Sequence, residues 1–176
     1  MERAVDPRSG VNGAASPGLP PASLRAALSH FATGVTIVCC LDDAGASVGL
    51  TANSFNALSL DPPLVLWSLR RSSPSVSAFM QAPHFAVNVL SEAQVDLSRR
   101  FASQVADKFT DGAWSRGEGG VPVLTGCAAV FECETVSSQE AGDHVLFIGR
   151  VLRATEAALA PLVFHAGHYH LLGEIL

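Results

Sequence analysis

Residues 35–52 read VTIVCCLDDAGASVGLTA, and this stretch determines the class of fold that we expect. Val35–Leu41 is rich in β-branched residues, which favour strands. Residues 42–45, DDAG, have the composition of a turn, and Ser47–Ala52 forms a second extended run. Two such runs joined by a short turn predict an antiparallel β-hairpin.

More short extended runs follow along the chain: Phe55–Leu60, Leu64–Leu69, Phe85–Leu90, His144–Arg153, Leu162–Phe164 and His168–Leu172. Between them, alternation of Ala129, Phe131 and Cys133 with polar residues predicts a half-buried strand, and Ser138–Asp143 predicts a turn. Gln104–Gly120 is polar and glycine-rich, as in a loop. Because the long crossovers that parallel strands need are mostly missing, we expect a mainly β fold, an antiparallel β-barrel with a few peripheral helices.

Two or three short helices are expected at the edges of this barrel, and the sequence offers three helix starts. Ser23 is predicted to be the N-cap of the first helix, and Gly34 is predicted to end it. The apolar face of this helix comprises Leu24, Ala27, Leu28 and Phe31. The dipeptide Ser73-Pro74 opens a second helix, since proline suits the first helical position. Residues 91–94, SEAQ, fit a capping box before the third.

Composition bounds the possible functions. The chain has 176 residues, expected as a disordered Pro/Gly-rich tail over 1–22 and one domain over 23–176. A net charge of −5 without a basic stripe argues against nucleic acid, and no apolar run is long enough for a membrane helix. With 48% hydrophobic and only 15% charged residues, we expect an unusually large apolar surface that is either buried within the chain or covered by a partner.

The four cysteines and the N-terminal residues bear on the compartment. Cys39 and Cys40 are adjacent and should point to opposite faces of a strand, and no C-x-x-C pair is present. We therefore expect buried, reduced thiols rather than a zinc site. The first 21 residues lack the apolar region of a signal peptide, which predicts a cytoplasmic protein.

Gly49–Phe55, GLTANSF, is the most informative stretch for chemistry. Small polar residues at a strand end let a flat ligand approach closely and offer hydrogen-bond donors. A flavin requires such donors at its pyrimidine carbonyls and N5, where charge accumulates on reduction. The alternative is a bend between strands whose hydroxyls are satisfied internally. No Rossmann, P-loop or nucleophile-elbow motif is present.

Five blocks in this order resemble the flavin reductase family: FATGVTIV at 31–38, GLTANSF at 49–55, LSLDPPLVL at 58–66, FAVNVL at 85–90 and GDHVLFIGRV at 142–151. The resemblance extends from about Leu24 to Leu172. It implies the FMN-binding split-barrel fold, a homodimer, and the small reductase component of a two-component flavin-dependent monooxygenase.

The resemblance also implies site residues. Flavin or nicotinamide contacts are expected at Thr51, Ala52, Asn53, Ser54, Ser68, Ser72, Ser75, Ala102, Ser103, Lys108, Phe109, His144, His168 and Tyr169. Ser72 and Ser75, beside two arginines, are assigned to the flavin phosphate, and Lys108 could pair with it or be solvated. His144 is assigned to the nicotinamide pocket as the catalytic residue, the alternative being a polar turn residue. We expect no metal, although His165, His168 and His170 lie close in sequence.

The function implied is NADH-dependent reduction of a diffusible flavin, FAD favoured over FMN, for a separate oxygenase acting on an aromatic substrate. A non-enzymatic flavin-binding electron carrier on the same barrel is one alternative. An oxidase of a pyridoxine phosphate is another, although the sequence lacks a dense set of Arg and Lys for a second phosphate. Because imidazole changes charge near neutral pH, the activity should depend on pH.

Overall fold

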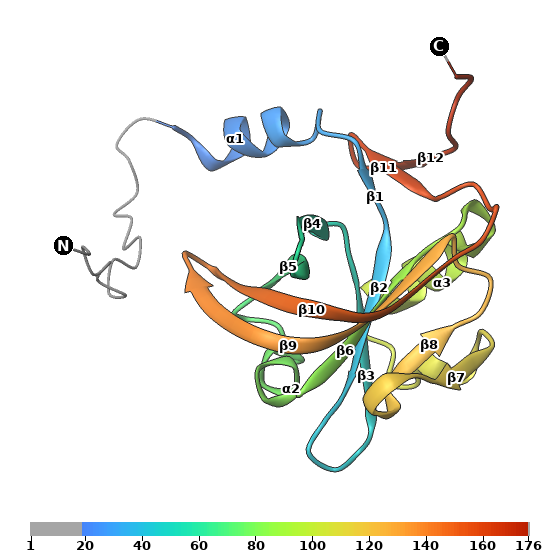
Figure 1. Cartoon of the computed structure of the whole chain (residues 1–176). Coiled ribbons are helices and arrows are strands. Elements are labelled where there is room, and N and C mark those ends of the chain that lie inside the picture. Colours follow the sequence, from blue (N-terminus) through green and yellow to red (C-terminus); the bar gives the residue numbers. More distant parts are fainter. Residues whose placement is uncertain (1–18, 176) are drawn as a thin grey trace.

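The hairpin predicted from residues 35–52 is present as β2 (Thr36–Leu41) and β3 (Ser47–Ala52), paired antiparallel from Thr36 with Ala52 to Leu41 with Ser47. The computed structural model describes residues 19–175 (Figure 1). The turn between β2 and β3 is held by the Asp42 carboxylate, which accepts hydrogen bonds from the backbone N–H groups of Ala44 and Ala46. The turn composition of the sequence therefore acts through one side chain.

A seven-stranded antiparallel sheet forms the body of the molecule, in the order β3-β2-β6-β9-β10-β5-β4. Its other strands are β4 (Asn56–Leu60), β5 (Pro63–Arg70), β6 (His84–Val89), β9 (Ala129–Ala141) and β10 (His144–Glu156). Figure 1 shows β9 and β10 as a long curved pair that crosses the other strands. The expected antiparallel barrel is confirmed.

Two small sheets complete the strands. The first has the order β1-β11-β12 and comprises β1 (Thr33–Gly34), β11 (Val163–His165) and β12 (His168–His170). The second pairs β7 (Trp114–Arg116) with β8 (Pro122–Leu124). β7 and the 3₁₀ turns η2 (Lys108–Thr110) and η3 (Glu118–Gly120) lie within Gln104–Gly120, where the sequence predicted only a loop, and β8 follows just after it.

The sheet separates two apolar clusters. One lies inside the curved sheet and is centred on Trp67, which stacks on Phe147 with ring centroids 4.7 Å apart. The other lies between the opposite face and the peripheral elements, around Ile37, Phe101 and Leu124. Cys40 belongs to the first cluster and Cys39 to the second, as their adjacency on one strand predicts.

The helices are α1 (Pro21–Leu28), α2 (Val76–Gln81) and α3 (Val95–Ala102), the last preceded by the 3₁₀ turn η1 (Glu92–Gln94). The capping box at Ser91 is confirmed. The Ser23 cap is wrong, because the Pro20-Pro21 pair starts α1 earlier, and Phe31 and Gly34 lie beyond its end. The second helix begins after Ser75, two residues later than predicted.

Three further expectations need correction or lie partly outside the structure. β9 is covered on both faces near its start, because Val130 and Glu132 are buried on one face and Cys133 on the other. The Glu132 carboxylate accepts the backbone N–H of Glu118 at 2.6 Å. The predicted turn over 138–143 is shorter, since β9 continues to Ala141. Of the predicted tail, residues 1–18 lie outside the described part, and α1 begins before the boundary at 22.

Candidate functional site

Four element ends converge on one cleft of about 490 Å³, here called the main cleft. β3 and β5 end there, β10 begins there, and α3 ends beside it. Arg70 and His144 are register partners, which brings the cation and the imidazole to the same edge. The lining residues are Leu50, Thr51, Ala52, Asn53, Ser54, Ser68, Leu69, Arg70, Ser72, Ser73, Pro74, Ser75, Phe101, Ala102, Ser103, Gln104, Lys108 and His144.

The charge of the main cleft is opposite to that of the chain. Among its lining residues are Arg70 and Lys108, but no aspartate or glutamate, although the chain carries a net charge of −5. Neither cation forms an ion pair with a side chain in residues 19–175. The neighbouring Arg71, by contrast, pairs with Glu140 at 3.4 Å. The cleft is therefore suited to an anionic ligand.

Three of the predicted hydroxyls are used within the protein. Thr51 Oγ1 donates to the Ser98 carbonyl at 2.7 Å and ties β3 to α3. Ser54 Oγ donates to the Ser68 carbonyl at 2.8 Å and accepts the Ser68 N–H at 3.0 Å. Ser103 Oγ donates to the Arg100 carbonyl. These side chains shape the wall, so donors for a ligand must come from other groups.

Other hydroxyls remain available to a ligand. Those of Ser68 and Ser72 make no hydrogen bond, and that of Ser75 makes none either, within the part of the chain that the structure describes. Leu50 and Leu69 add apolar surface next to them. A wall that combines free hydroxyls, small residues and apolar patches matches a flat heteroaromatic ring with polar edges.

His144 has a fixed orientation. Its Nδ1 lies 2.7 Å from the Asp143 carboxylate, so Nδ1 carries the proton and Nε2 is left for other contacts. The imidazole is half-buried and lines the main cleft. The hydrogen bond from His144 and its charge hold the pKa of the Asp143 carboxyl below its usual value. The sequence analysis missed Asp143, although its position in GDH was the available signal.

Lys108 comes from the segment after α3, whereas Arg70 comes from the end of β5. Its Nζ donates to the Phe101 carbonyl at 3.0 Å, which leaves further N–H groups of the ammonium for a ligand. Desolvation by burial lowers the pKa of the Lys108 ammonium. An anion in the cleft would oppose this shift by stabilising the charged form.

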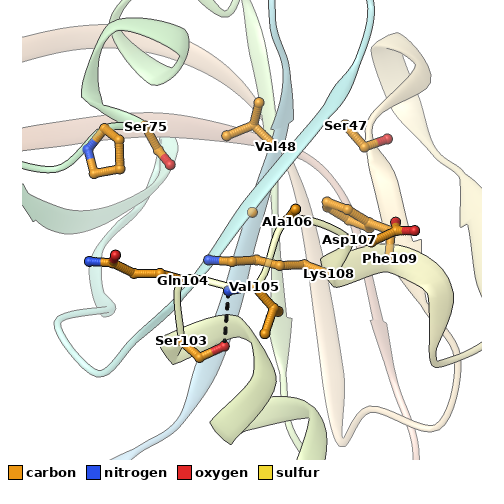
Figure 2. Close-up of a pocket in the computed structure, with 12 residues that line it drawn as sticks. Ser47, Val48, Ser75, Ser103, Gln104, Val105, Ala106, Asp107, Lys108 and Phe109 are labelled. Carbon is orange, nitrogen blue, oxygen red and sulfur yellow. Dashed lines mark hydrogen bonds between the residues drawn. The ribbon is translucent and has the colours of Figure 1, made fainter.

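A second cleft, here called the side cleft, adjoins the first and has a volume of about 660 Å³. The two share the residues Pro74, Ser75, Ser103, Gln104 and Lys108. Figure 2 shows Ser75 and the 103–109 segment around this side cleft, with the Lys108 ammonium directed toward the Gln104 side. Phe109 lines the side cleft but not the main one.

Two predicted residues lie outside both clefts. Tyr169 packs on α3, where its hydroxyl lies 2.8 Å from Ser98 Oγ and the Arg99 guanidinium lies over its ring. His168 is exposed, and its Nδ1 contacts the Ala166 carbonyl. Within residues 19–175 no group of three or more His, Cys, Asp or Glu side chains could hold a metal ion.

Sequence reasoning therefore found most of the main cleft. The structure brings together eleven predicted residues there: Thr51, Ala52, Asn53, Ser54, Ser68, Ser72, Ser75, Ala102, Ser103, Lys108 and His144. It adds Arg70, whose place at the end of β5 follows from the alternation of that strand. Gln104 and Pro74 are also additions, and they had no signal beyond proximity to predicted residues.

The fold and the cleft together define a class: a split-barrel protein with a cleft that is lined by Arg70 and Lys108 and by no carboxylate. The model of the flavin reductase like domain matches residues 28–173. This chain belongs to that family. No helix within the described residues is long and apolar enough to cross a membrane.

Relatives and solved structures agree with this assignment. An FMN reductase (NADH) of Agrobacterium fabrum is 46% identical over 147 residues, covering 84% of this chain and 83% of the relative. The reductase component of a trigonelline monooxygenase from Acinetobacter baylyi is 42% identical, covering 83% of this chain and 47% of the relative. The solved NADH:FAD oxidoreductase of Streptomyces globisporus is 32% identical, with a TM-score of 0.82, covering 100% of this chain and 95% of that one.

The lengths of the relatives differ from that of this chain. The chain spans about half of some curated relatives that it matches, 48% in one from Rhizobium meliloti that is 46% identical. It spans 65% of a second protein from the same organism, a stachydrine N-demethylase reductase subunit. Activities and partners of those proteins are therefore grounds for a proposal about this chain.

Proposed function

We propose that the protein is an NADH-dependent reductase of a diffusible flavin and supplies reduced flavin to a separate oxygenase. The observation that carries this proposal is the main cleft of an acidic chain: it is lined by no carboxylate and by two cations that form no ion pair within residues 19–175. Relatives named as FMN reductase (NADH) and as reductase components of monooxygenases support the same activity.

Bound flavin would supply the hydride acceptor, and the protein supplies binding and orientation. Leu50 and Leu69 offer the apolar surface for the ring, and Ala52, Asn53 and Ser54 line the cleft beside them and would meet its polar edge. Ser72 and Ser75, with Arg70 and Lys108, form the phosphate site, because no carboxylate lines the main cleft. The charge of Arg70 also acts on the Asp143 carboxyl, which does not line the cleft, and helps to lower its pKa.

His144 positions the nicotinamide of NADH at the open edge of the main cleft. The Asp143 carboxylate holds Nδ1, which aims the other ring nitrogen away from the carboxylate. Nε2 can then hydrogen-bond a polar substituent and fix the orientation that hydride transfer requires. In this scheme Asp143 acts through His144 and is a positioning residue.

FAD is the flavin that the paired clefts favour. The main cleft has a volume of about 490 Å³, and the adjoining side cleft, which shares five lining residues with it, has about 660 Å³. FMN leaves this second space empty, whereas the adenosine half of FAD can enter it. The solved structure from Streptomyces globisporus is that of an NADH:FAD oxidoreductase, whereas the sequence relative from Agrobacterium fabrum is an FMN reductase (NADH).

A homodimer completes the proposal. The apolar side chains of Leu24, Leu28 and Phe31 are 46%, 63% and 72% exposed, and Leu60 of β4 is 94% exposed. Surfaces of this kind are normally covered by a partner. The oxygenase that receives the flavin is proposed to hydroxylate an aromatic compound, and the four free, buried cysteines suit a reducing cytoplasm.

Steady-state oxidation of NADH and of NADPH, with FAD and FMN titrated separately, tests the proposal. The expected result is flavin-dependent oxidation of NADH with a lower KM for FAD than for FMN. The Arg70→Met variant should raise the KM for flavin, whereas Arg71→Met, which removes an equal charge already paired with Glu140, should leave it near wild type. No acceleration by either flavin contradicts the proposal.

A further inference from the structure

The segment that carries Lys108 and Phe109 has few apolar anchors of its own, yet it forms a wall of both clefts. Phe109 packs against Phe101 and Trp114, whereas Asp107 is exposed and Lys108 is half-buried, so one side chain provides the apolar packing of the segment. It borders the main cleft through Lys108 and the side cleft through Asp107, Lys108 and Phe109. The Lys108 Nζ donates to the Phe101 carbonyl at 3.0 Å, and a further set of contacts holds the backbone of the segment around the lysine.

Arg100, at the end of α3, makes those contacts. Its Nε donates to the Lys108 carbonyl at 3.1 Å, and its Nη2 donates to the Asp107 carbonyl and to Thr110 Oγ1. Its Nη1 pairs with the Asp111 carboxylate at 2.8 Å. The 107–111 segment thus wraps around one guanidinium, which holds both of the backbone carbonyls nearest to the lysine.

The numbers of N–H donors on Arg100 and Lys108 separate the roles of these two side chains. A guanidinium has five N–H donors, and the contacts above engage four of those of Arg100. Arg100 lines neither cleft. An ammonium has three donors, and Lys108 uses one on the Phe101 carbonyl. Arg100 is therefore occupied by protein, and Lys108 is free to meet an anion.

We infer that Arg100 is a positioning residue that sets the affinity for the flavin phosphate by clamping the 107–111 segment, so that Lys108 faces the junction of the two clefts. This inference rests on the proposed function. It predicts a specific pattern: loss of Arg100 weakens flavins that carry phosphate, and leaves the ring site formed by β3 and β5 intact.

The test compares the dissociation constants of riboflavin, FMN and FAD, measured by fluorescence titration of the intact protein. In wild type, FMN and FAD should bind more tightly than riboflavin. Arg100→Met should weaken FMN and FAD roughly tenfold or more, the size of one lost hydrogen bond to a charged group, with little change for riboflavin. Lys108→Met should show the same pattern.

Arg99→Met is the matched control. It removes the same charge from the adjacent position, but Arg99 pairs with Asp96 and lies over the Tyr169 ring, away from the 107–111 segment. Its preference for FMN over riboflavin should equal that of wild type. Asp111→Asn removes one of the contacts of Arg100 and should give a smaller loss of the same preference, which decides the question if Arg100→Met does not fold.

Distinct results overturn the inference and the proposed function. If Arg100→Met keeps the wild-type preference for phosphate, or weakens riboflavin and FMN equally, Arg100 does not position Lys108. If wild type binds riboflavin as tightly as FMN, the junction is not a phosphate site, and the inference fails while the reductase proposal stands. If wild type binds no flavin, the proposed function fails as well.

Discussion

Replacing Ser54 with alanine removes a hydroxyl that pairs with the backbone N–H and C=O groups of Ser68, as a neighbouring strand would. Ser54 Oγ donates to the Ser68 carbonyl at 2.8 Å and accepts the Ser68 N–H at 3.0 Å. It continues the ladder between β4 and β5 past Asn56, which pairs with Leu66. In Ser54→Ala both backbone groups of Ser68 lose their partner at the floor of the main cleft.

The magnitude follows from the two bonds. Two neutral hydrogen bonds at about 0.5–1.5 kcal/mol each give roughly 1–3 kcal/mol, and water reaches a half-buried site, so we expect about 1–2 kcal/mol. With an m-value of about 2 kcal/mol/M, the urea midpoint should fall by about 0.5–1 M at equal protein concentration.

Ser72→Ala is the control for this measurement. It removes the same group from the same cleft, but the Ser72 hydroxyl has no hydrogen-bond partner in the described structure, so the midpoint should not change. If Ser54→Ala unfolds at the wild-type midpoint and yet loses flavin affinity, the hydroxyl contacts the ligand directly, and our reading of it as a positioning group is wrong.

Other predictions concern packing, thiols and titration. In Gly49→Ala the new Cβ would lie 2.8 Å from a ring carbon of Phe101, which should cost about 1–3 kcal/mol in urea unfolding, whereas Gly34→Ala has nothing within 4 Å and should be neutral. Burial raises the pKa of three of the cysteine thiols to about 12 and that of the fourth as well, so none should react with Ellman's reagent at neutral pH until the protein unfolds. In His144→Ala the pKa of the Asp143 carboxyl should rise, as followed by NMR. The contribution of the Asp143–His144 pair to stability is present above about pH 4 and is lost as the pH falls through the lowered pKa of Asp143. If Asp143 titrates at the same pH in His144→Ala as in wild type, this account of the pair is wrong.

Much of the fold could be predicted because local pattern and global topology agree. The hairpin at 35–52 carries its own turn signal, and the adjacent Cys39 and Cys40 lie on opposite faces as alternation requires. Helix starts were less accurate, since Ser23 and Ser73 are good capping residues that the prolines at 20–21 and the turn before α2 override. The capping preference of a single residue does not show at which residue the helix begins in the folded protein.

The candidate site could be predicted in its residues but less in their roles. The sequence indicates hydroxyls at Thr51 and Ser54, but only the structure shows that both donate to carbonyls of distant segments. The role of Arg100 depends on a segment that follows it in sequence without any periodic pattern. Contacts of this kind have no local signature, so the sequence could not have shown them.

Flavin reduction in a single turnover tests the central claim most directly. Protein, FAD and NADH are mixed without oxygen, and the loss of the absorbance of oxidised flavin is followed with time. We predict that the protein accelerates this loss over the reaction without it, and that a variant lacking both Arg70 and Lys108 is much slower at low FAD concentration. If the wild-type protein gives the same rate as NADH and FAD alone, the main cleft is not a flavin reductase site.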